Sequence, residues 1–153
     1  MFGEIVDGGM RLNDIGIIIF QTIEEIPKYY SNIEVDIFSV MPNHIHLIIC
    51  IVGADPCVRP IKNGQTRGFA PTEKQLSLPQ IIQRFKSLTT KKCIDGVKQN
   101  ILIPFENRIW QRNYYEHIIR NEKSYDEIYS YIESNPSTWG RDMNNPKNIA
   151  KRA

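Results

Sequence analysis

Residues 45–52 restrict the fold more than any other part of the sequence, because they are apolar at nearly every position. Such a run is typical of a strand that is buried on both faces of a sheet. Residues 33–40 alternate and are rich in β-branched side chains, which predicts a second strand. Residues 41–43 (Met-Pro-Asn) lie between them and predict a turn. We therefore expect a strand, a tight turn and a buried strand over residues 33–52.

The remaining elements follow from the spacing of apolar side chains, which is three to four residues in helices and two in strands. We expect, in chain order, a hairpin at residues 4–12, a helix from Asn13 or Asp14 to Pro27, a surface loop at 53–76, a helix from the capping box Ser77-x-x-Gln80 to about Lys92, a strand at 108–119, and a helix from the capping box Ser124-x-x-Glu127 to Asn135-Pro136. This order of helices and strands indicates an α+β fold in a single domain, residues 1–153.

Composition excludes several classes of protein. Hydrophobic residues make up 41% of the chain and charged residues 24%, which is ordinary for a soluble globular protein. No apolar run approaches the roughly 20 residues that span a bilayer, and the N-terminus lacks a signal-peptide pattern. We therefore expect a cytoplasmic protein with no membrane partner. The net charge of +2 neither requires nor excludes nucleic acid as a partner.

His44 and His46 flank Ile45 at the start of the buried strand. Because side chains alternate along a strand, both imidazoles are expected on the same face of the sheet. Two imidazoles this close can bind one divalent cation and leave positions open for substrate. The alternative is a pair of histidines that only form hydrogen bonds. His117, the third histidine, is expected to be structural or to contact a phosphate.

The last predicted helix carries three of the seven tyrosines. One helical stripe is expected to face the core, and it consists of Tyr125, Ile128, Tyr129 and Ile132. Tyr131 lies roughly 110° from the centre of that stripe. Glu127 stands one turn before it and Asn135 one turn after it, so these three residues line one flank. This flank is either an ordinary amphipathic edge or a positioned nucleophile with a nearby metal ligand. Tyr114 and Tyr115 are the alternative nucleophiles.

Four segments, in this order, resemble motifs of one enzyme family. They are residues 40–48, which include His44-Ile45-His46, then Phe85-Lys86-Ser87 followed by Thr89, residues 109–120 from Ile109 to Arg120, and residues 131–136 from Tyr131 to Pro136. These segments resemble the REP-associated tyrosine transposases and the related single-tyrosine insertion-sequence transposases, which are HUH enzymes. The resemblance covers about residues 30–140.

The resemblance implies a ferredoxin-like antiparallel sheet with helices on one face and an added C-terminal catalytic helix. It implies that His44 and His46 bind a divalent metal, Mg²⁺ or Mn²⁺, and that Asn135 completes the metal shell. Tyr131 would be the nucleophile. The implied reaction is the cleavage and rejoining of single-stranded, hairpin-forming DNA through a 5′-phosphotyrosine. Some members of the family are dimers, so a homodimer is one expected state.

Basic and aromatic side chains that could contact this DNA gather in two stretches of the chain. Phosphate contacts are expected from Arg84, Lys86, Lys91, Lys92 and Arg112, and base stacking from Trp110 and from Tyr114 or Tyr115. Most such charges on a protein surface are only solvated, and this stays the alternative for each of them.

Family members usually begin with a core strand ahead of the small hairpin, whereas here the hairpin follows Met1 almost at once. The first core strand is therefore expected to be missing and the domain to be shortened at its N-terminus. Either residues 1–12 or a partner subunit would then pair with the open edge of residues 45–51, or activity would be poor. Two other functions stay open, a catalytically impaired or domesticated DNA-binding protein of the same fold and a metal-dependent hydrolase. The hydrolase would need a further carboxylate or histidine ligand.

Overall fold

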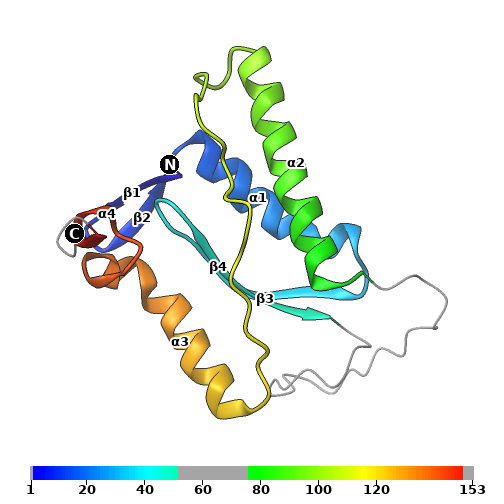
Figure 1. The fold of residues 1–153 in the computed structure, drawn as a ribbon, viewed down its shortest axis with the longest axis vertical. Coiled ribbons are helices and arrows are strands. Elements are labelled where there is room, and N and C mark those ends of the chain that lie inside the picture. The colour runs from blue at the N-terminus through cyan, green and yellow to red at the C-terminus, as the bar shows by residue number, and fades with distance from the viewer. Residues whose placement is uncertain (1, 52–75, 150–153) are drawn as a thin grey trace.

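The computed structural model describes residues 2–51 and 76–149, in which two strand pairs, separated by one helix, precede the remaining helices. The elements are β1 (Gly3–Val6), β2 (Gly9–Leu12), α1 (Asp14–Tyr29), β3 (Ile33–Val40), β4 (Ile45–Ile51), α2 (Leu78–Lys98), α3 (Glu122–Thr138), the 3-10 helix η1 (Trp139–Arg141) and α4 (Pro146–Ile149). The strands form two antiparallel pairs, β1–β2 and β3–β4 (Figure 1). The expected α+β fold class is confirmed.

The β3–β4 hairpin separates two layers of helix. Ser39 lies opposite His46 in the hairpin, so both side chains point to the same face of the sheet. Phe38 points to the other face, where its ring packs 4.9 Å from the ring of Phe20 in α1. The ring of His46 lies 5.3 Å from that of Tyr131 in α3. The hairpin therefore has α1 on one face and α3, the predicted catalytic helix, on the face that carries His46 (Figure 1).

The core forms where α1 and α2 pack together against the hairpin. Their buried side chains recur every three to four residues, as the sequence predicts. The main members are Ile19, Ile23 and Ile26 of α1, Ile81 and Phe85 of α2, Ile33 and Val40 of β3, and Phe2. None of the helices within residues 2–51 and 76–149 is both long and apolar enough to cross a membrane.

All three long helices extend beyond their predicted bounds. α1 continues for two residues past Pro27: the proline lacks its own N–H donor, but the backbone N–H of Tyr30 still donates to the carbonyl of Ile26. α2 continues past Lys92, where the buried Cys93 adds another turn to its apolar side. α3 begins before Ser124, because the side chain of Asn121 accepts a hydrogen bond from the backbone N–H of Ser124 and caps the helix.

Residues 108–119 form no regular strand, so this prediction is wrong. Figure 1 shows the segment as an irregular trace that runs from α2 toward α3. A strand needs a neighbour that satisfies its backbone groups, and the sheets of the described chain contain only β1–β2 and β3–β4. Two carbonyl groups of the segment, at Gln111 and Asn113, instead accept hydrogen bonds from the ammonium group of Lys86. Without a sheet to cover them, Tyr115 and Ile118 remain exposed.

The hairpin β1–β2 pairs with itself and not with β4, so the expectation that residues 1–12 pair with the edge of residues 45–51 is wrong. Phe2 instead connects the start of the chain to the turn before β4, because its N–H donates to the carbonyl of Pro42. Pairing of the β4 edge with a partner subunit stays a prediction. The loop expected at residues 53–76 lies outside the described residues except for Leu76, which packs against the core.

Gly16 allows the first turn of α1 to approach this N-terminal segment. A Cβ atom at Gly16 would lie 2.0 Å from the carbonyl oxygen of Phe2. Alanine usually stabilises a helix by roughly 1 kcal/mol relative to glycine. We nevertheless expect Gly16→Ala to lower the free energy of unfolding by about 1–3 kcal/mol, because the backbone must shift to remove the clash. Urea unfolding measures this change.

Gly140→Ala is the matched control, since a Cβ atom there would meet nothing within 4 Å. We expect its free energy of unfolding to stay within about 0.5 kcal/mol of the original. If Gly16→Ala is as stable as the original protein, the close approach of Phe2 to α1 is incorrect.

Candidate functional site

His44 and His46 meet at the start of β4, on the face covered by α3. Their Nε2 atoms are 2.8 Å apart, and their rings are nearly perpendicular at 85°. Two nitrogen ligands that bind one ion at right angles are about 3 Å apart. The two Nε2 atoms therefore have almost the separation of neighbouring ligands on a single cation. Without a cation, one imidazole donates a hydrogen bond to the other.

The proton on His44 can be placed from its neighbours. The side-chain amide of Asn43 donates through Nδ2 to the carbonyl of Asn144, so its Oδ1 atom faces Nδ1 of His44 at 2.8 Å. Because Oδ1 only accepts hydrogen bonds, Nδ1 of His44 carries the proton. The lone pair of the neutral ring is then on Nε2, which points toward His46. Such a hydrogen bond on the far side of the ring is typical of metal-binding histidines.

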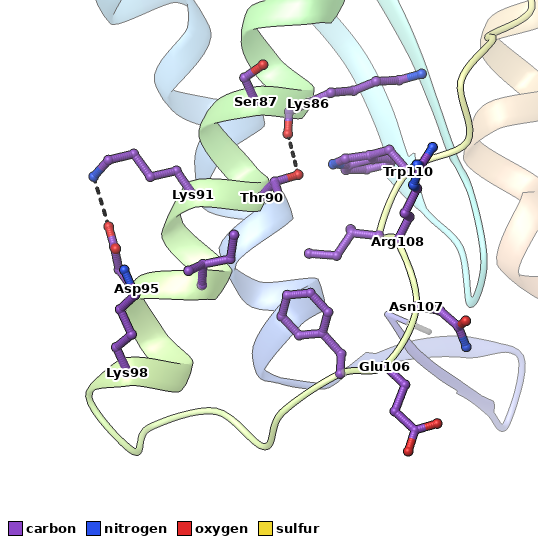
Figure 2. Close-up of a pocket in the computed structure, with 13 residues that line it drawn as sticks. Lys86, Ser87, Thr90, Lys91, Asp95, Lys98, Glu106, Asn107, Arg108 and Trp110 are labelled. Carbon is purple, nitrogen blue, oxygen red and sulfur yellow. Dashed lines mark hydrogen bonds and ion pairs between the residues drawn. The ribbon is translucent and has the colours of Figure 1, made fainter.

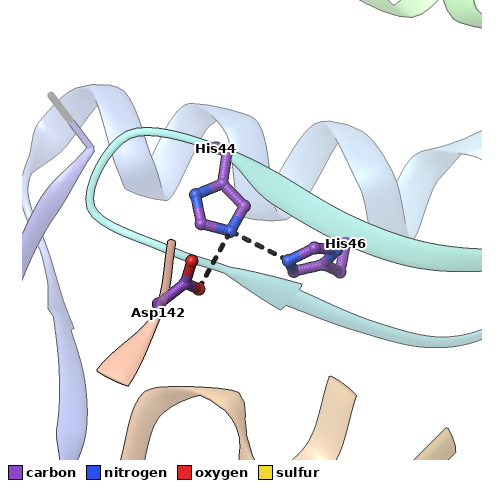
Figure 3. Close-up of side chains that lie close together, drawn as sticks. All are labelled: His44, His46 and Asp142. Carbon is purple, nitrogen blue, oxygen red and sulfur yellow. Dashed lines mark hydrogen bonds and ion pairs between the residues drawn. The ribbon is translucent and has the colours of Figure 1, made fainter. Parts of the chain in front are cut away.

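Asp142 is the third member of this group. Its Oδ2 atom lies 3.7 Å from Nε2 of His44, and its side chain is only 4% exposed. One ligand atom each from His44, His46 and Asp142 lie within 4.8 Å of one another (Figure 3). Oδ2 has no hydrogen-bond partner among residues 2–51 and 76–149. A buried carboxylate oxygen without a donor is costly, and a divalent cation between the three side chains would offset that cost. These residues therefore fit a metal ion.

Sequence reasoning missed Asp142, because no local motif marks it. It follows η1, almost a hundred positions after the histidines along the chain, and only the folded structure brings it to them. The one available signal was chemical, since a site with two histidines generally needs a further protein ligand.

Tyr131 lies next to the histidine pair within the same chain. Its ring centroid is 5.3 Å from that of His46, and the two rings meet edge to face at 78°. Its side chain is 48% exposed, so solvent and a substrate can reach it. The structure thus brings together the predicted nucleophile and the predicted metal ligands. The assignment of these roles stays a prediction.

Asn135 is placed differently from the expectation. The sequence places Asn135 one turn beyond Tyr131 on the same flank of α3. In the structure Tyr131 is half exposed, whereas Asn135 is 1% exposed, so the two ends of this flank differ in burial. Its Nδ2 atom has no hydrogen-bond partner in the described part of the chain. Its role as a metal ligand stays a prediction.

The environment keeps both histidines neutral at pH 7. Burial lowers the pKa of His44, against the attraction of the Asp142 carboxylate. Burial and the neighbouring His44 lower the pKa of His46 to about 4, again against the attraction of Asp142. Neutral imidazole is the form that binds metal ions.

The metal-free protein should therefore lose stability in acid. The unfolded chain has a histidine pKa of about 6.5, so below this pH it binds more protons than the folded protein does. The stability that depends on a neutral His46, measured as the free energy of unfolding, is fully present above pH 6.5. It is lost as the pH falls from there toward about 4. Urea unfolding in the presence of a chelator, repeated across this range, measures the loss.

The double variant His44→Gln/His46→Gln is the control, because glutamine does not titrate. Its free energy of unfolding should fall less steeply between pH 6.5 and 4 than that of the original protein. Equal slopes would show that the two histidines titrate normally when folded.

Several predicted DNA contacts already have partners inside the protein. Trp110 donates a hydrogen bond to the hydroxyl of Thr89, and its ring lies 5.3 Å from that of Phe85. Lys86 bonds to two backbone carbonyls, and its ammonium group lies 5.7 Å from the ring of Tyr114. These contacts hold the segment after α2 against that helix. DNA contacts by Trp110, Lys86 and Tyr114 stay a prediction.

Of the other predicted phosphate contacts, Arg84, Lys91 and Arg112 lie at the surface, whereas Lys92 is partly buried and pairs with Glu25. Lys91 pairs with Asp95, and the guanidinium group of Arg84 lies 5.7 Å from the ring of Tyr30. Arg112 is exposed. A cleft of about 840 Å³ opens between the C-terminal half of α2 and residues 105–110. Its charged lining consists of Lys86, Lys91, Lys98 and Arg108, with Asp95 and Glu106 (Figure 2).

Comparison with known proteins identifies one clear relative. The chain is 40% identical over 147 residues to a protein of Haemophilus influenzae described as "Uncharacterized protein". The match covers 94% of this chain and 76% of the relative. No family model matches the chain, and no solved structure matches it. The identity and coverage show that the two proteins are homologous, and the description of the relative names no activity.

Proposed function

This chain belongs to the same family as the Haemophilus influenzae protein, and we propose that it cleaves and rejoins single-stranded, hairpin-forming DNA through a covalent bond to Tyr131. One observation carries the proposal, which is the position of Tyr131. Its half-exposed ring lies 5.3 Å from that of His46, and His46 lies 2.8 Å from His44 between their Nε2 atoms. This proximity of Tyr131 to the two histidines, on one face of the β3–β4 hairpin, supports the proposal that Tyr131 is the nucleophile and that His44 and His46 bind the metal.

The proposed reaction is a transesterification. The hydroxyl oxygen of Tyr131 loses its proton and attacks the phosphorus atom, which forms a 5′-phosphotyrosine bond. The bond between phosphorus and the 3′-oxygen breaks, and that oxygen takes up a proton and leaves as a free 3′-hydroxyl. A divalent ion held by His44 and His46, Mg²⁺ or Mn²⁺, would offset the negative charge of the phosphate oxygens. A 3′-hydroxyl then attacks the phosphotyrosine, which restores the phosphodiester and frees Tyr131. Because one ester replaces another, no external energy source is needed.

The other tyrosines are poorer candidates for the nucleophile. Tyr125 donates its hydroxyl hydrogen to the carboxylate of Asp36 and is partly buried. Tyr114 bonds to Glu116, and burial and that carboxylate raise the pKa of Tyr114. A raised pKa makes the reactive phenolate harder to form. Among the tyrosines that the structure describes, Tyr131 is the one whose ring contacts a histidine of the candidate site, His46.

A second candidate function follows from Asp142. A metal-dependent hydrolase would use water as the nucleophile and would need a carboxylate or histidine beyond His44 and His46. Asp142 supplies a carboxylate at the pair, which favours this alternative. In a hydrolase the cleaved strand leaves the protein, whereas in the proposed reaction one fragment stays bound to Tyr131.

A labelled-strand experiment separates these functions. The protein is incubated with single-stranded hairpin DNA and Mn²⁺, and the products are resolved under denaturing conditions. We expect a 3′-label to remain on the protein and a 5′-label to leave, because the tyrosine holds the 5′-phosphate of the downstream fragment. Cleavage without an attached label would favour the hydrolase. Binding without cleavage would favour a DNA-binding protein without catalysis.

A further inference from the structure

Asp142 follows η1 and lies against the turn between β3 and β4, residues 41–44, which we call the histidine turn. Its backbone N–H donates to the carbonyl of Trp139, and its own carbonyl accepts from the side chain of Asn148. The ring of Trp139 packs 5.9 Å from that of His44. On the other side of Asp142, the backbone carbonyl of Asn144 accepts a hydrogen bond from the side-chain amide of Asn43, which belongs to the histidine turn. The position of the carboxylate is therefore fixed on both sides by contacts with the histidine turn.

The two carboxylate oxygens of Asp142 have different surroundings. Oδ1 accepts a hydrogen bond of 2.7 Å from the backbone N–H of Asn144. Oδ2 is buried, lacks a donor among residues 2–51 and 76–149, and faces Nε2 of His44 at 3.7 Å. Nε2 of His44 carries a lone pair, because its proton is on Nδ1. Two acceptors therefore face each other in a buried place, an arrangement that a cation between them makes favourable.

The distances suit one ion. Ligands of an octahedral ion are about 3 Å apart when adjacent and about 4 Å apart when opposite. The separation of 2.8 Å between the two Nε2 atoms is close to the first value, and 3.7 Å between Nε2 of His44 and Oδ2 of Asp142 lies between the two. All three ligand atoms lie within 4.8 Å of one another, so small side-chain movements would bring them onto one ion. Three coordination positions then remain open on the side away from the protein ligands.

We propose that Oδ2 of Asp142 is the third protein ligand, so that His44, His46 and Asp142 form a two-histidine, one-carboxylate centre that selects Mn²⁺ over Mg²⁺. The inference rests on the metal site of the proposed function. Mg²⁺ prefers oxygen ligands and retains several waters, so two imidazoles disfavour it. Mn²⁺ accepts both imidazole and carboxylate ligands. Asp142 then takes the place in the metal shell that the resemblance gives to Asn135.

Metal binding by the whole protein, without DNA, tests this assignment. Calorimetric titration with MnCl₂ and with MgCl₂, and the electron paramagnetic resonance signal of free Mn²⁺, give the two affinities. We expect Mn²⁺ to bind at least about tenfold more tightly than Mg²⁺. Asp142→Asn should weaken Mn²⁺ binding by about ten- to a hundredfold, because the ligand loses its charge. Asp126→Asn, which changes an exposed acid on α3, should leave both affinities unchanged.

The melting temperature of the metal-free variants separates a ligand from a structural residue. Asparagine has nearly the shape of aspartate and keeps the acceptor for Asn144, so we expect metal-free Asp142→Asn to melt at or above the temperature of the original protein. A purely structural carboxylate would instead make the variant less stable and leave the affinity for Mn²⁺ in the folded fraction unchanged. Asp142→Glu, which keeps the charge, should retain more Mn²⁺ affinity than Asp142→Asn.

The outcomes distinguish this inference from the proposed function. Undiminished Mn²⁺ affinity in Asp142→Asn, together with its loss in the double histidine variant, would remove Asp142 from the ligand set and leave the proposed function standing. Equal affinity for Mg²⁺ and Mn²⁺, or no Mn²⁺ binding by the original protein, would also overturn the inference. The proposed function is decided separately, by attachment of the 3′-label to Tyr131.

Discussion

Tyr131→Phe should abolish the covalent protein–DNA adduct, with a loss of more than about 10³-fold, because the substitution removes the attacking oxygen. The phenyl ring still fills the place beside His46, and the side chain is half exposed, so the fold should be unaffected. We therefore expect DNA binding, measured by gel shift, and the melting temperature to stay close to those of the original protein. Adduct formation is measured as protein-bound 3′-label.

The controls are Tyr114→Phe and Tyr115→Phe. Tyr131 is the tyrosine with a ring contact to His46, whereas Tyr114 donates its hydroxyl hydrogen to Glu116, so the hydroxyls of Tyr114 and Tyr115 are not expected to react with DNA. Both variants should form the adduct at the original rate. An adduct that persists in Tyr131→Phe would show that Tyr131 is not the nucleophile, and peptide mapping of the labelled residue would then identify the true one.

The second large effect is expected from the histidines. His44→Ala/His46→Ala removes two metal ligands at once, so Mn²⁺ affinity should fall by at least about a hundredfold and DNA cleavage should cease. Calorimetric titration measures the affinity, and release of the 5′-label measures cleavage. Asn135→Ala should have a much smaller effect on affinity, because Asp142, and not Asn135, is the third ligand in the proposed centre.

His117→Ala is the matched control, since this histidine is exposed and lies in the segment after α2. It should leave Mn²⁺ affinity unchanged. Because Asn135 is buried, Asn135→Ala also destabilises the fold. Its Mn²⁺ affinity is therefore compared with that of the original protein at a temperature where the melting curves show both to be folded. Full Mn²⁺ affinity in the double histidine variant would remove the basis for a metal site at β4.

Local patterns in the sequence predict much of this fold. β3 and β4 follow from alternation and from a buried apolar run, and α1, α2 and α3 follow from helical spacing. Alternation along the strand also places the two imidazoles on one face, and the structure brings them within 2.8 Å. These features depend on neighbours a few residues apart, which is the range over which sequence periodicity is informative.

The features that sequence reasoning missed depend on distant contacts. Residues 108–119 alternate like a strand, yet strand formation needs a partner edge, and alternation does not specify one. Asn135 is buried because α3 packs against the hairpin in a particular rotation, which a helical stripe defines only approximately. Asp142 reaches His44 through the path of a loop, and no periodicity encodes such a path.

The hydrogen bond between Asn43 and Asn144 joins two parts of the chain that are synthesised at different times. Its two partners are separated by 101 positions, and the bond between Phe2 and Pro42 holds the same turn from the other end of the chain. Contacts over such separations form late, because the intervening chain must be ordered first. A nascent chain that has left the ribosome only as far as α2 has both histidines but neither Tyr131 nor Asp142. The histidines therefore leave the ribosome before Tyr131 and Asp142, and the proposed site can assemble only after the segment that carries those two residues has followed.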